Sequence, residues 1–448
     1  MKNFKIKRLE DLRFSLLILL IICNFVIFKS AIGYNIYWAN LHSHTGLSDG
    51  QSTPEHAFTY ARDTANIDIL AITDHTHYLT PSSYQYLRNV ARQFTVPGQF
   101  VAIAGQEFGS LSAFGHFSIF EAESLCPVSV NNLEMTYQWI AKNKVQTQFN
   151  HPRYGDFKYL AFDRNGNEYV STIEIVNGSG NYTPLYEERY IEALNLGWHI
   201  APVANQDNHR ANWGNQTTSQ GQIPLSGIWA EELTKEKILE AISKKRVYAC
   251  EIRPSNDKIY LNDFVVNNTK MGDVCYTQDR NVIIKVNVSA NINFAKIYLF
   301  RNGILYDSAP NNLMNQNNIN WVYSDTITFG YYFVKGVQQD GDQFWSAPVW
   351  VIVQQPIENI QVVPHPIRGT SQIRFPEVVG ADSSEMFIYT IEGKLVYQEK
   401  KAYPVGHTWN GLDRNNQLLP NGIYLIVVRA KTPSEEKIFK GKVALLRQ

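Results

Sequence analysis

Short apolar runs alternate with longer amphipathic stretches between residue 36 and about residue 251. The short runs are typical of buried strands, and the amphipathic stretches are typical of helices that cover a sheet. The predicted strands are Ile36–Leu41, Ile67–Ile72, Phe100–Ala104, Val145–Phe149, Thr172–Val176, His199–Ala204 and Gly227–Ala230. The predicted helices are Pro54–Thr64, Ser82–Gln93, Leu133–Lys142, Leu185–Asn195 and Lys235–Ser243. This alternation favours parallel βα units, and about seven of them suggest closure into a barrel, although periodicity alone also fits an open doubly wound sheet.

Beyond this region the helical pattern stops, and the rest of the chain has the pattern of strands and turns. The predicted strands of a β-sandwich over residues 253–354 are Asn281–Ala290, Lys296–Phe300, Tyr331–Val337 and Pro348–Val353. Gln354–Glu358 is a predicted linker. Residues 357–448 form a further all-strand block, in which an Asn-Gly turn signal precedes the strand Ile423–Val428. We therefore expect an α/β barrel over residues 34–252, followed by two Ig-like β-sandwich domains.

The N-terminus has the pattern of an export signal. Positive charges precede the apolar run Phe14–Phe28, and small residues follow at Ala31 and Gly33, spaced as a signal peptidase requires. This run of about 15 residues is short for a membrane-spanning helix, which needs about 20. We therefore predict a signal peptide over residues 1–33, with an uncleaved membrane anchor as the alternative. The protein is then periplasmic, displayed on the cell surface or secreted.

Composition bears on two further questions: whether a nucleic acid is a partner, and whether the cysteines form a disulfide. The chain carries 41 basic and 41 acidic residues, and a net charge of zero gives no electrostatic reason to expect a nucleic-acid partner. The cysteines are Cys23 in the leader and Cys126, Cys250 and Cys275 in the mature chain. A Cys250–Cys275 disulfide is conceivable, and buried free thiols are the equally simple alternative. Composition does not indicate an oligomeric state.

Residues of the metal-binding type follow the predicted strands one after another. They are His42, His44, Asp49, Asp74, His75, Glu107, His116, His151, Asp207 and His209. Residues two apart on a strand share one face, so His42 and His44 can address one pocket. Imidazole and carboxylate groups are ligands for zinc, manganese and iron, and this set is too large for one four-coordinate ion. We therefore predict a site for two or three divalent ions, with Glu107 or an aspartate bridging two of them.

Each member of this set has a simpler explanation when it is taken alone. A lone His-x-His most often caps a helix or fills space in a core. Asp74 suits a helix cap, and Glu107 alone fits a polar group that is hydrogen-bonded in a loop. His56 and His77 do not follow strands in the same way, so we interpret them as solvent-facing or supporting residues. His199 begins a predicted strand at the opposite end and is interpreted as a core residue. The successive placement of the others at strand ends favours the metal site.

At these positions the chain resembles a known family, the PHP (polymerase and histidinol phosphatase) domain. The resemblance lies in the strings Asn40-Leu-His-Ser-His-Thr-Gly-Leu-Ser-Asp-Gly50, Ala71-Ile-Thr-Asp-His75, Gly105-Gln-Glu107, Gly115-His116, Asn150-His-Pro152 and Gln206-Asp-Asn-His209. It covers roughly residues 34–252 and fills every ligand position of the family. A further likeness to the carbaryl-hydrolase-like branch lies in Phe114-Gly-His-Phe and Trp198-His-Ile-Ala-Pro.

The resemblance implies a distorted (β/α)7 TIM-like barrel with a three-ion site. By analogy, the ions are held by three sets: His42, His44, Glu107 and Asp207; Glu107, His116 and His151; and Asp49, His75 and His209. Asp74 is expected to orient one of the ligand histidines. We expect catalysis to depend on Glu107, Asp207 and His209, together with two or three ions of zinc, manganese or iron.

A site of this kind hydrolyses esters without a serine or cysteine nucleophile, because the ions activate water and neutralise developing charge. Arg153, Arg210 and Asn205 flank the ligands and are candidates for contacts with substrate oxygens. A salt bridge or loop anchor is the alternative for each arginine. We predict a phosphoesterase acting on a small-molecule phosphomonoester or phosphodiester. A carboxylic or carbamic ester hydrolase and a non-catalytic surface binding module are the alternatives.

The C-terminal region also has likenesses to known domains. The chain is similar to a β-sandwich domain that often follows this PHP branch. The similarity lies in Tyr331-Tyr-Phe-Val, Gln339-Asp-Gly and Trp345-Ser-Ala-Pro-Val-Trp350. The last block resembles the Ig-like domain of the flagellar hook-capping protein and the sorting domain of type IX secretion. The residues concerned are Pro364-His-Pro, Ile373-Arg-Phe375, Trp409-Asn-Gly411 and Leu419-Pro-Asn-Gly-Ile-Tyr424. The likeness implies secretion machinery or a cell surface as a partner.

Overall fold

The computed structural model describes residues 33–110, 114–127, 129–178, 182–254, 258–327, 329–353, 360–363, 365–367, 369–375, 381–402, 407–432 and 436–446. Residues 1–32 of the predicted leader and the predicted linker Gln354–Glu358 lie outside these described residues. The chain divides into two compact units, Met1–Ile352 and Val353–Gln448, and each is described by itself. Within the described ranges, no helix is both long and apolar enough to cross a membrane.

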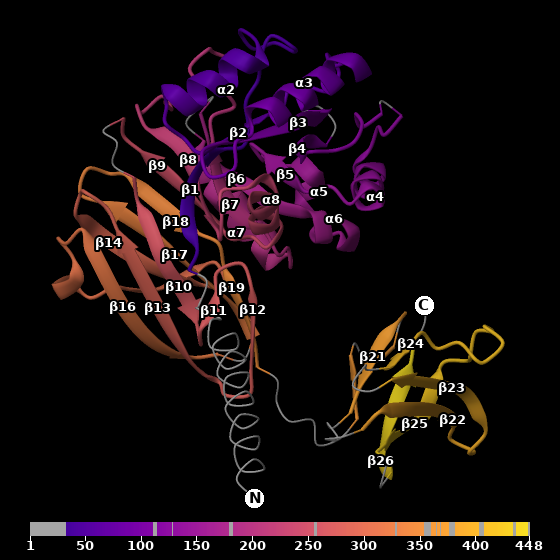
Figure 1. Ribbon diagram of the computed structural model, residues 1–448. Coiled ribbons are helices and arrows are strands. Elements are labelled where there is room, and N and C mark those ends of the chain that lie inside the picture. The colour runs from indigo at the N-terminus through magenta and orange to yellow at the C-terminus, as the bar shows by residue number, and fades with distance from the viewer. Residues whose placement is uncertain are drawn as a thin grey trace, which may run out of the picture. The chain divides into compact units, whose positions relative to one another are not determined.

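The first unit begins with a mixed α/β region (Figure 1). Its strands are β1 (Asn35–Asn40), β2 (Ile69–Ile72), β3 (Val101–Ser110), β4 (Gly115–Phe120), β5 (Thr147–Asn150), β6 (Val170–Asn177), β7 (Ala201–Asn205), β8 (Ile223–Ala230) and β9 (Val247–Ile252). Its helices are α2 (Pro54–Asp63), α3 (Pro81–Phe94), α4 (Leu133–Asn143), α5 (Asp156–Leu160), α6 (Arg164–Tyr169), α7 (Thr183–Asn195) and α8 (Lys235–Ser243). Helices α2, α3 and α8 begin at threonine caps, whose side chains accept hydrogen bonds from backbone N–H groups of the first turn.

The strands of this region run in both directions, which differs from the uniform parallel pattern that the sequence predicts. β1, β2 and β3 are parallel, as are β5, β6 and β7, but β4 is antiparallel to both of its neighbours. β4 was not among the predicted strands. The reversal is a hairpin between Gly109 and Gly115, whose φ angles of 136° and 87° lie where side chains are disfavoured. A Cβ atom at Gly109 would lie 2.1 Å from the carbonyl oxygen of Gly115.

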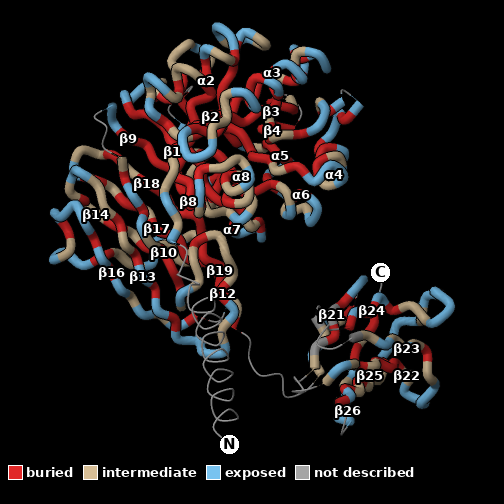
Figure 2. Tube along the Cα trace, in the orientation of Figure 1, coloured by how far each residue is buried: buried red, intermediate tan, exposed pale blue. Residues whose placement is uncertain are grey.

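The sheet curls so that the segments after β1 and β7 meet. Ser43 forms an isolated parallel bridge with Asn208, and the backbone N–H of His44 donates to the Asn208 carbonyl over 2.8 Å. The Asn205 side chain accepts from the backbone N–H of Leu41, also over 2.8 Å. Figure 2 shows buried strands inside a layer whose outer helix surfaces are exposed. The carboxyl ends of the first and last parallel strands are therefore fixed beside each other.

An antiparallel β region completes the first unit. Its strands are β10 (Tyr260–Val266), β11 (Thr269–Lys270), β12 (Val274–Thr277), β13 (Asn281–Ser289), β14 (Phe294–Arg301), β15 (Ile304–Ser308), β16 (Asn318–Thr326), β17 (Phe329–Gln338), β18 (Gln343–Ser346) and β19 (Val349–Val353), with a short 3-10 helix at Asn311–Leu313. β11, β10, β13 and β16 form a separate four-stranded sheet. Along β13 exposed and buried residues alternate at the start of the strand, as expected for a sheet with one solvated face.

The other sheet of this β region is continuous with the α/β sheet. β18 pairs antiparallel with β9, with Phe344 opposite Cys250 and Trp345 opposite Ala249. The strand order β12-β19-β17-β18-β9-β8-β1 therefore runs across residue 253, where the sequence pattern changes from helical to all-strand. Cys126, Cys250 and Cys275 are all buried and free, so the alternative of free thiols holds.

The second unit is built from two small antiparallel sheets. Its strands are β20 (Gln361–Val363), β21 (Ser371–Arg374), β22 (Ser383–Thr390), β23 (Leu395–Ala402), β24 (His407–Trp409), β25 (Gly422–Lys431) and β26 (Glu436–Leu445). The sheets have the orders β20-β21-β24 and β23-β22-β25-β26. Side chains such as Met386, Trp409 and Ile426 fill the core between them. The mixed α/β region is thus followed by antiparallel sheets in both units.

A buried histidine joins the two sheets of the second unit. His407 Nε2 lies 3.0 Å from the Ser384 hydroxyl, and its Nδ1 lies 2.8 Å from the Glu399 carboxylate. Lys401 pairs with the same carboxylate at 3.2 Å, and the Phe375 ring centroid lies 6.1 Å from that of His407. Burial lowers the pKa of His407 below its ordinary value of 6.5, although Glu399 acts in the opposite direction. The fold therefore favours the neutral ring.

We predict that the second unit loses stability as pH falls. Because the folded-state pKa of His407 is lowered, the stabilisation is complete above 6.5 and is lost as pH drops through the folded value. Hydrogen exchange of the full chain, corrected for intrinsic rates, should show a smaller free energy of opening for β22 and β25 at about pH 5 than at about pH 7. His407→Asn should remove this dependence of the opening free energy on pH. His365→Asn, at an exposed position, is the control variant and should retain it. Equal opening energies at both pH values contradict the prediction.

Candidate metal centre

Histidines and carboxylates converge where the strands of the curled sheet end. His42, His44 and Asp49 follow β1, His75 follows β2, Glu107 lies in β3, His116 in β4, His151 follows β5, and Asp207 and His209 follow β7. These side chains form four overlapping groups: His44, Asp49, His75 and His209; His42, His151 and Asp207; His42, His44 and Glu107; and His75, Glu107 and His116. Within each group the potential ligand atoms lie within 4.8 Å of one another. Every predicted metal ligand belongs to at least one group.

Glu107 is the centre of this arrangement and is 2% exposed. Its carboxylate oxygens lie 3.2 Å from His42 Nε2, 3.5 Å from His44 Nε2, 2.9 Å from His75 Nδ1, 3.1 Å from His116 Nδ1 and 3.2 Å from His151 Nε2. The Asn150 amide donates a further hydrogen bond to Oε1 over 2.8 Å. One carboxylate thus contacts histidines delivered by four different strands and the loops that follow them.

Asp207 and Asp49 extend the cluster toward solvent. Asp207 Oδ1 lies 3.4 Å from His42 Nε2 and 3.2 Å from His44 Nε2. Asp49 lies 3.5 Å from His75 Nε2 and 3.3 Å from His209 Nε2. The Asp49 and His209 side chains are 41% and 36% exposed, whereas those of His42 and His44 are fully buried. The cluster is therefore closed at Glu107 and open at Asp49 and His209.

The three ligand sets expected from the family resemblance can be compared with these contacts. Glu107 and Asp207 each contact both His42 and His44, and Glu107 also contacts His116 and His151. The third set gains a member, because His44 Nδ1 lies 3.9 Å from Asp49 and its ring stacks on His209 at 4.1 Å. His75 contacts Glu107 as well as Asp49. Neighbouring sets therefore share residues.

The electrostatics of the cluster are dominated by buried carboxylates. Burial acts to raise the pKa of Glu107, but His42, with hydrogen bonds from His116 and His151, holds it well below 4.5. The pKa of Asp207 is likewise lowered, by His42 and His44 against the effect of burial. Burial acts to lower the pKa of His42, and Asp207 and Glu107 raise it well above 6.5. Both carboxylates are ionised, so the cluster attracts positive charge.

Divalent ions fit this donor set. Ligands that form metal bonds of about 2.0–2.2 Å at right or tetrahedral angles lie about 2.8–3.6 Å apart. The distances from Glu107 to histidine nitrogens, 2.9 to 3.5 Å, fall in that range. Among the described residues, the ion pairs of Glu107 and Asp207 involve histidines alone. A cation is therefore the natural partner of these two buried charges.

Two potential ligands occupy a strained backbone conformation. His151 has a φ of 28° and Asp207 a φ of 46°, in the region that favours glycine. Each such residue costs on the order of 1–3 kcal/mol, and such strain is concentrated at functional sites. The loop that carries Asp207 packs against Gly178, where a Cβ atom would lie 2.5 Å from the Gln206 carbonyl oxygen. This tight packing helps to hold the Asp207 side chain in the cluster.

Glu174 is a supporting residue that the sequence reasoning missed. It lies in the fully buried strand β6, and its carboxylate is 2.9 Å from His42 Nδ1. It also accepts hydrogen bonds from the backbone N–H of His151 at 2.7 Å and from the amides of Asn177 at 2.9 Å and Asn205 at 3.1 Å. A carboxylate on the far nitrogen of a histidine fixes the tautomer and leaves Nε2 as the ligand atom. The signal was a lone Glu within an apolar strand.

Asp74 supports the loop that carries His44 and Asp49. It accepts hydrogen bonds from the Thr45 backbone N–H and hydroxyl, both over 2.7 Å, and from the Ser48 hydroxyl over 2.5 Å. Ser48 in turn lies 3.5 Å from His44 Nδ1. Asp74 therefore reaches a ligand histidine through Ser48, as a supporting residue and not as a member of the ligand groups.

The predicted substrate-binding residues lie in two different environments. Arg153 and Arg210 are exposed and follow His151 and His209 closely in the chain. Asn205 is fully buried, and its amide is engaged by Leu41, Gln148 and Glu174. Asn205 is thus placed to hold strand ends together, whereas the arginines are free to meet a ligand from solvent.

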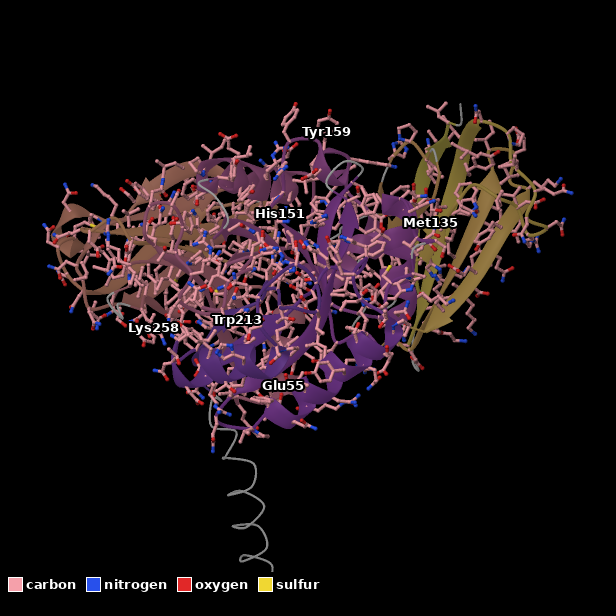
Figure 3. All side chains as sticks on the ribbon, turned by 90° about the horizontal axis from the view of Figure 1, so that it is seen from above. Glu55, Met135, His151, Tyr159, Trp213 and Lys258 are labelled. Carbon is pink, nitrogen blue, oxygen red and sulfur yellow. The ribbon has the colours of Figure 1, made fainter. Side chains whose placement is uncertain are left out.

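The remaining histidines of this region lie outside the ligand groups. His56 is exposed and contacts the Ser52 hydroxyl at 2.7 Å. His77 is exposed, with its ring 5.2 Å from that of His75. His199 stacks on Trp350 at 4.3 Å, and burial lowers its pKa to about 4. His151 and Trp213, both labelled in Figure 3, are buried, and Trp213 donates to the His44 carbonyl over 3.0 Å.

Comparison with known proteins gives distant similarities. No protein-family model matches the chain. Uncharacterised proteins of Chlamydia pneumoniae and Chlamydia trachomatis are 21% and 20% identical over 367 and 370 residues, or 71% of this chain. The chain spans 57% of the length of these curated relatives. A solved two-domain protein from Bacteroides vulgatus, described as containing a predicted PHP-like metal-dependent phosphoesterase, is similar over 71% of this chain and 95% of its own, with 15% identity and a TM-score of 0.42.

We predict that Glu174→Gln weakens metal binding without unfolding the protein. The amide keeps the shape of the side chain but removes the charge that holds His42, and loss of such a support typically costs about 10- to 100-fold in metal affinity. Titration against a competing chelator measures the effect. Glu188→Gln, at an exposed position of α7, is the matched control and should bind metal like the unaltered chain. Equal affinities in the two variants contradict the role assigned to Glu174.

Proposed function

We propose that the chain is a metal-dependent phosphoesterase acting on small-molecule phosphate esters. The observation that carries the proposal is the contact of Glu107 with five histidine rings in a cluster that opens to solvent at Asp49 and His209. The motif set that resembles the PHP domain supports the same reading. The finer assignment of a three-ion site in a (β/α)7-type barrel is part of this proposal.

Residues of the chain would hold the metal ions, balance their charge and orient the substrate. Divalent ions bound at this donor set supply Lewis-acid activation of water and neutralise charge on the ester oxygens. Glu107 and Asp207, both ionised, attract positive charge to the cluster. Glu174 fixes His42 so that Nε2 points to these carboxylates. These contacts preorganise the site before a substrate arrives.

The open side of the cluster supplies the groups that meet substrate. His209 Nδ1 lies 2.9 Å from the Asp207 carbonyl oxygen, which can only accept, so Nδ1 carries the proton. Nε2 is then left to bind a cation shared with Asp49, whose carboxylate lies 3.3 Å away. That geometry suits His209 for a metal ligand or for receiving a proton at Nε2. Arg153 and Arg210 are exposed and lie close in the chain to His151 and His209, and their guanidinium groups suit binding of phosphate oxygens.

A tetrahedral phosphoryl group matches a cluster with several adjoining ligand groups better than a planar ester does. Its oxygens can be bound at more than one of the groups at once. A carboxylic or carbamic ester can use the same site, and it is the runner-up substrate class.

We extend the proposal to location. The leader pattern of residues 1–33 supports export, and the compact second unit suits a sorting or attachment module. The protein then acts in the periplasm, at the cell surface or outside the cell.

We predict chelator-sensitive hydrolysis of phosphate esters. Nitrophenyl phosphodiester, phosphomonoester, acetate and carbamate share one leaving group, so the panel compares the reacting centres directly. The purified protein is assayed with manganese or zinc and with a chelator. Turnover of carboxylic or carbamic esters alone moves the assignment to the runner-up. Absence of turnover in a protein that retains its metal contradicts an ester hydrolase and favours a binding module.

Glu107→Gln should lower kcat on the best of these substrates by about 100-fold or more, because it removes the shared charge of the cluster. His56→Ala is the control, since His56 is exposed and lies outside the ligand groups. Equal activities of the two variants would mean that the ligand assignment is wrong.

A further inference from the structure

A second hollow lies in the first unit, away from the metal centre. Its volume is about 520 Å³, which is within the range of small-molecule sites. It is lined by Gly33, Tyr34, Trp229, Asn262, Asp263, Lys270, Lys285, Val286, Asn287, Asn320, Trp321 and Val322. None of these belongs to the four ligand groups. Figure 1 shows the start of β1 beside β10 and β11, which carry part of this lining.

Three asparagine side chains that line the hollow form a hydrogen-bonded row: Asn262, Asn287 and Asn320. Asn287 lies opposite Asp263 of β10 on one side and opposite Asn320 of β16 on the other. A bulge between Leu261 and Asp263 brings in Asn262, whose amide donates to the Asn287 oxygen over 2.8 Å. Asn287 in turn donates to the Asn320 oxygen. The row therefore ends at the exposed Asn320, which offers amide donors to the hollow.

Three charged side chains line the same hollow without pairing with one another. Among the ion pairs of the described residues, none involves Asp263, Lys270 or Lys285. Asp263 is half-buried, and its Oδ1 is buried without a hydrogen-bond partner. Burial raises the pKa of Asp263, while Lys270 and Lys285 act to lower it. A buried acceptor without a hydrogen-bond donor costs stability, and the two lysines offset part of that cost by favouring the charged carboxylate.

Cations lie against two of the aromatic rings that line the hollow. The Lys270 ammonium lies 4.9 Å from the Tyr34 ring centroid and 5.7 Å from that of Trp229. Arg246 lies 4.8 Å from the Tyr34 ring centroid. Stacking of a flat apolar ligand on Tyr34 is therefore disfavoured. Recognition here has to use ionic contacts and hydrogen bonds.

We propose that this hollow binds a sugar acid, such as a hexuronate residue of an acidic glycan. Its carboxylate would pair with Lys285 and Lys270, and its hydroxyls would exchange hydrogen bonds with Asn287 and Asn320. A hexuronate ring is small enough for this volume. It combines the one negative charge and the several hydroxyls that this lining requires. The proposal is independent of the reaction at the metal centre.

Calorimetric titration of the purified, metal-loaded protein with short galacturonate oligomers tests the proposal. Neutral glucose oligomers of the same length are the comparison ligands. We expect binding of the acidic oligomers and much weaker binding of the neutral ones. Lys285→Ala and Asn320→Ala, both at exposed positions, should each weaken binding about tenfold, as expected for a lost charge-assisted or paired hydrogen bond.

Lys440→Ala, at an exposed position of β26, is the matched control and should leave binding unchanged. Uronates can also bind divalent ions, and binding at the metal centre would survive Lys285→Ala. Full retention of affinity in Lys285→Ala and Asn320→Ala therefore overturns the proposal. Equal affinity for neutral oligomers, or tighter binding of an acidic peptide than of the sugar acids, also overturns it.

Discussion

A carboxylate withdrawn from water is stable only where positive charge or hydrogen-bond donors replace its lost hydration. Glu107 meets this requirement through five histidine rings and the Asn150 amide. Because those rings come from four strands and the loops that follow them, the ends of these strands have to meet around one point. Misplacement of any one strand would leave part of a buried charge without a partner, so the fold and the cluster constrain each other.

The reversed strand β4 shows how the fold satisfies that constraint. Ser118 pairs with Glu107 across the β3–β4 hairpin, so His116, two residues earlier, is a diagonal neighbour on the same face. If β4 were a parallel strand, a separate βα unit would be needed to bring its histidine to the same edge of the sheet. The hairpin instead brings His116 to 3.1 Å from Glu107 within a short stretch of chain. The glycines at Gly109 and Gly115 make this turn sterically possible.

Sequence patterns locate much of the cluster because its members are polar residues at the ends of apolar strands. His42 and Asp207, for example, lie beside each other in space although they are far apart along the chain. Three features were not predictable in the same way. Glu174 lies inside an apolar strand, and its contact with His42 depends on how the strands are placed relative to one another in the fold. The direction of β4 depends on glycine conformation, and the pairing of β9 with β18 depends on contacts between segments that are distant in sequence.

The strand β1 connects the two sites of the first unit. Tyr34 lines the hollow just before this strand, Ile36 pairs with Trp229, and His42 follows the strand at the metal centre. At about 3.3 Å per residue in an extended chain, the eight steps from Tyr34 to His42 span roughly 25 Å. A single sugar ring is far shorter than this span, so a ligand in the hollow does not reach the ions. The amino end of β1 thus helps to build the hollow and its carboxyl end helps to build the metal centre, and one strand fixes the positions of two separate sites.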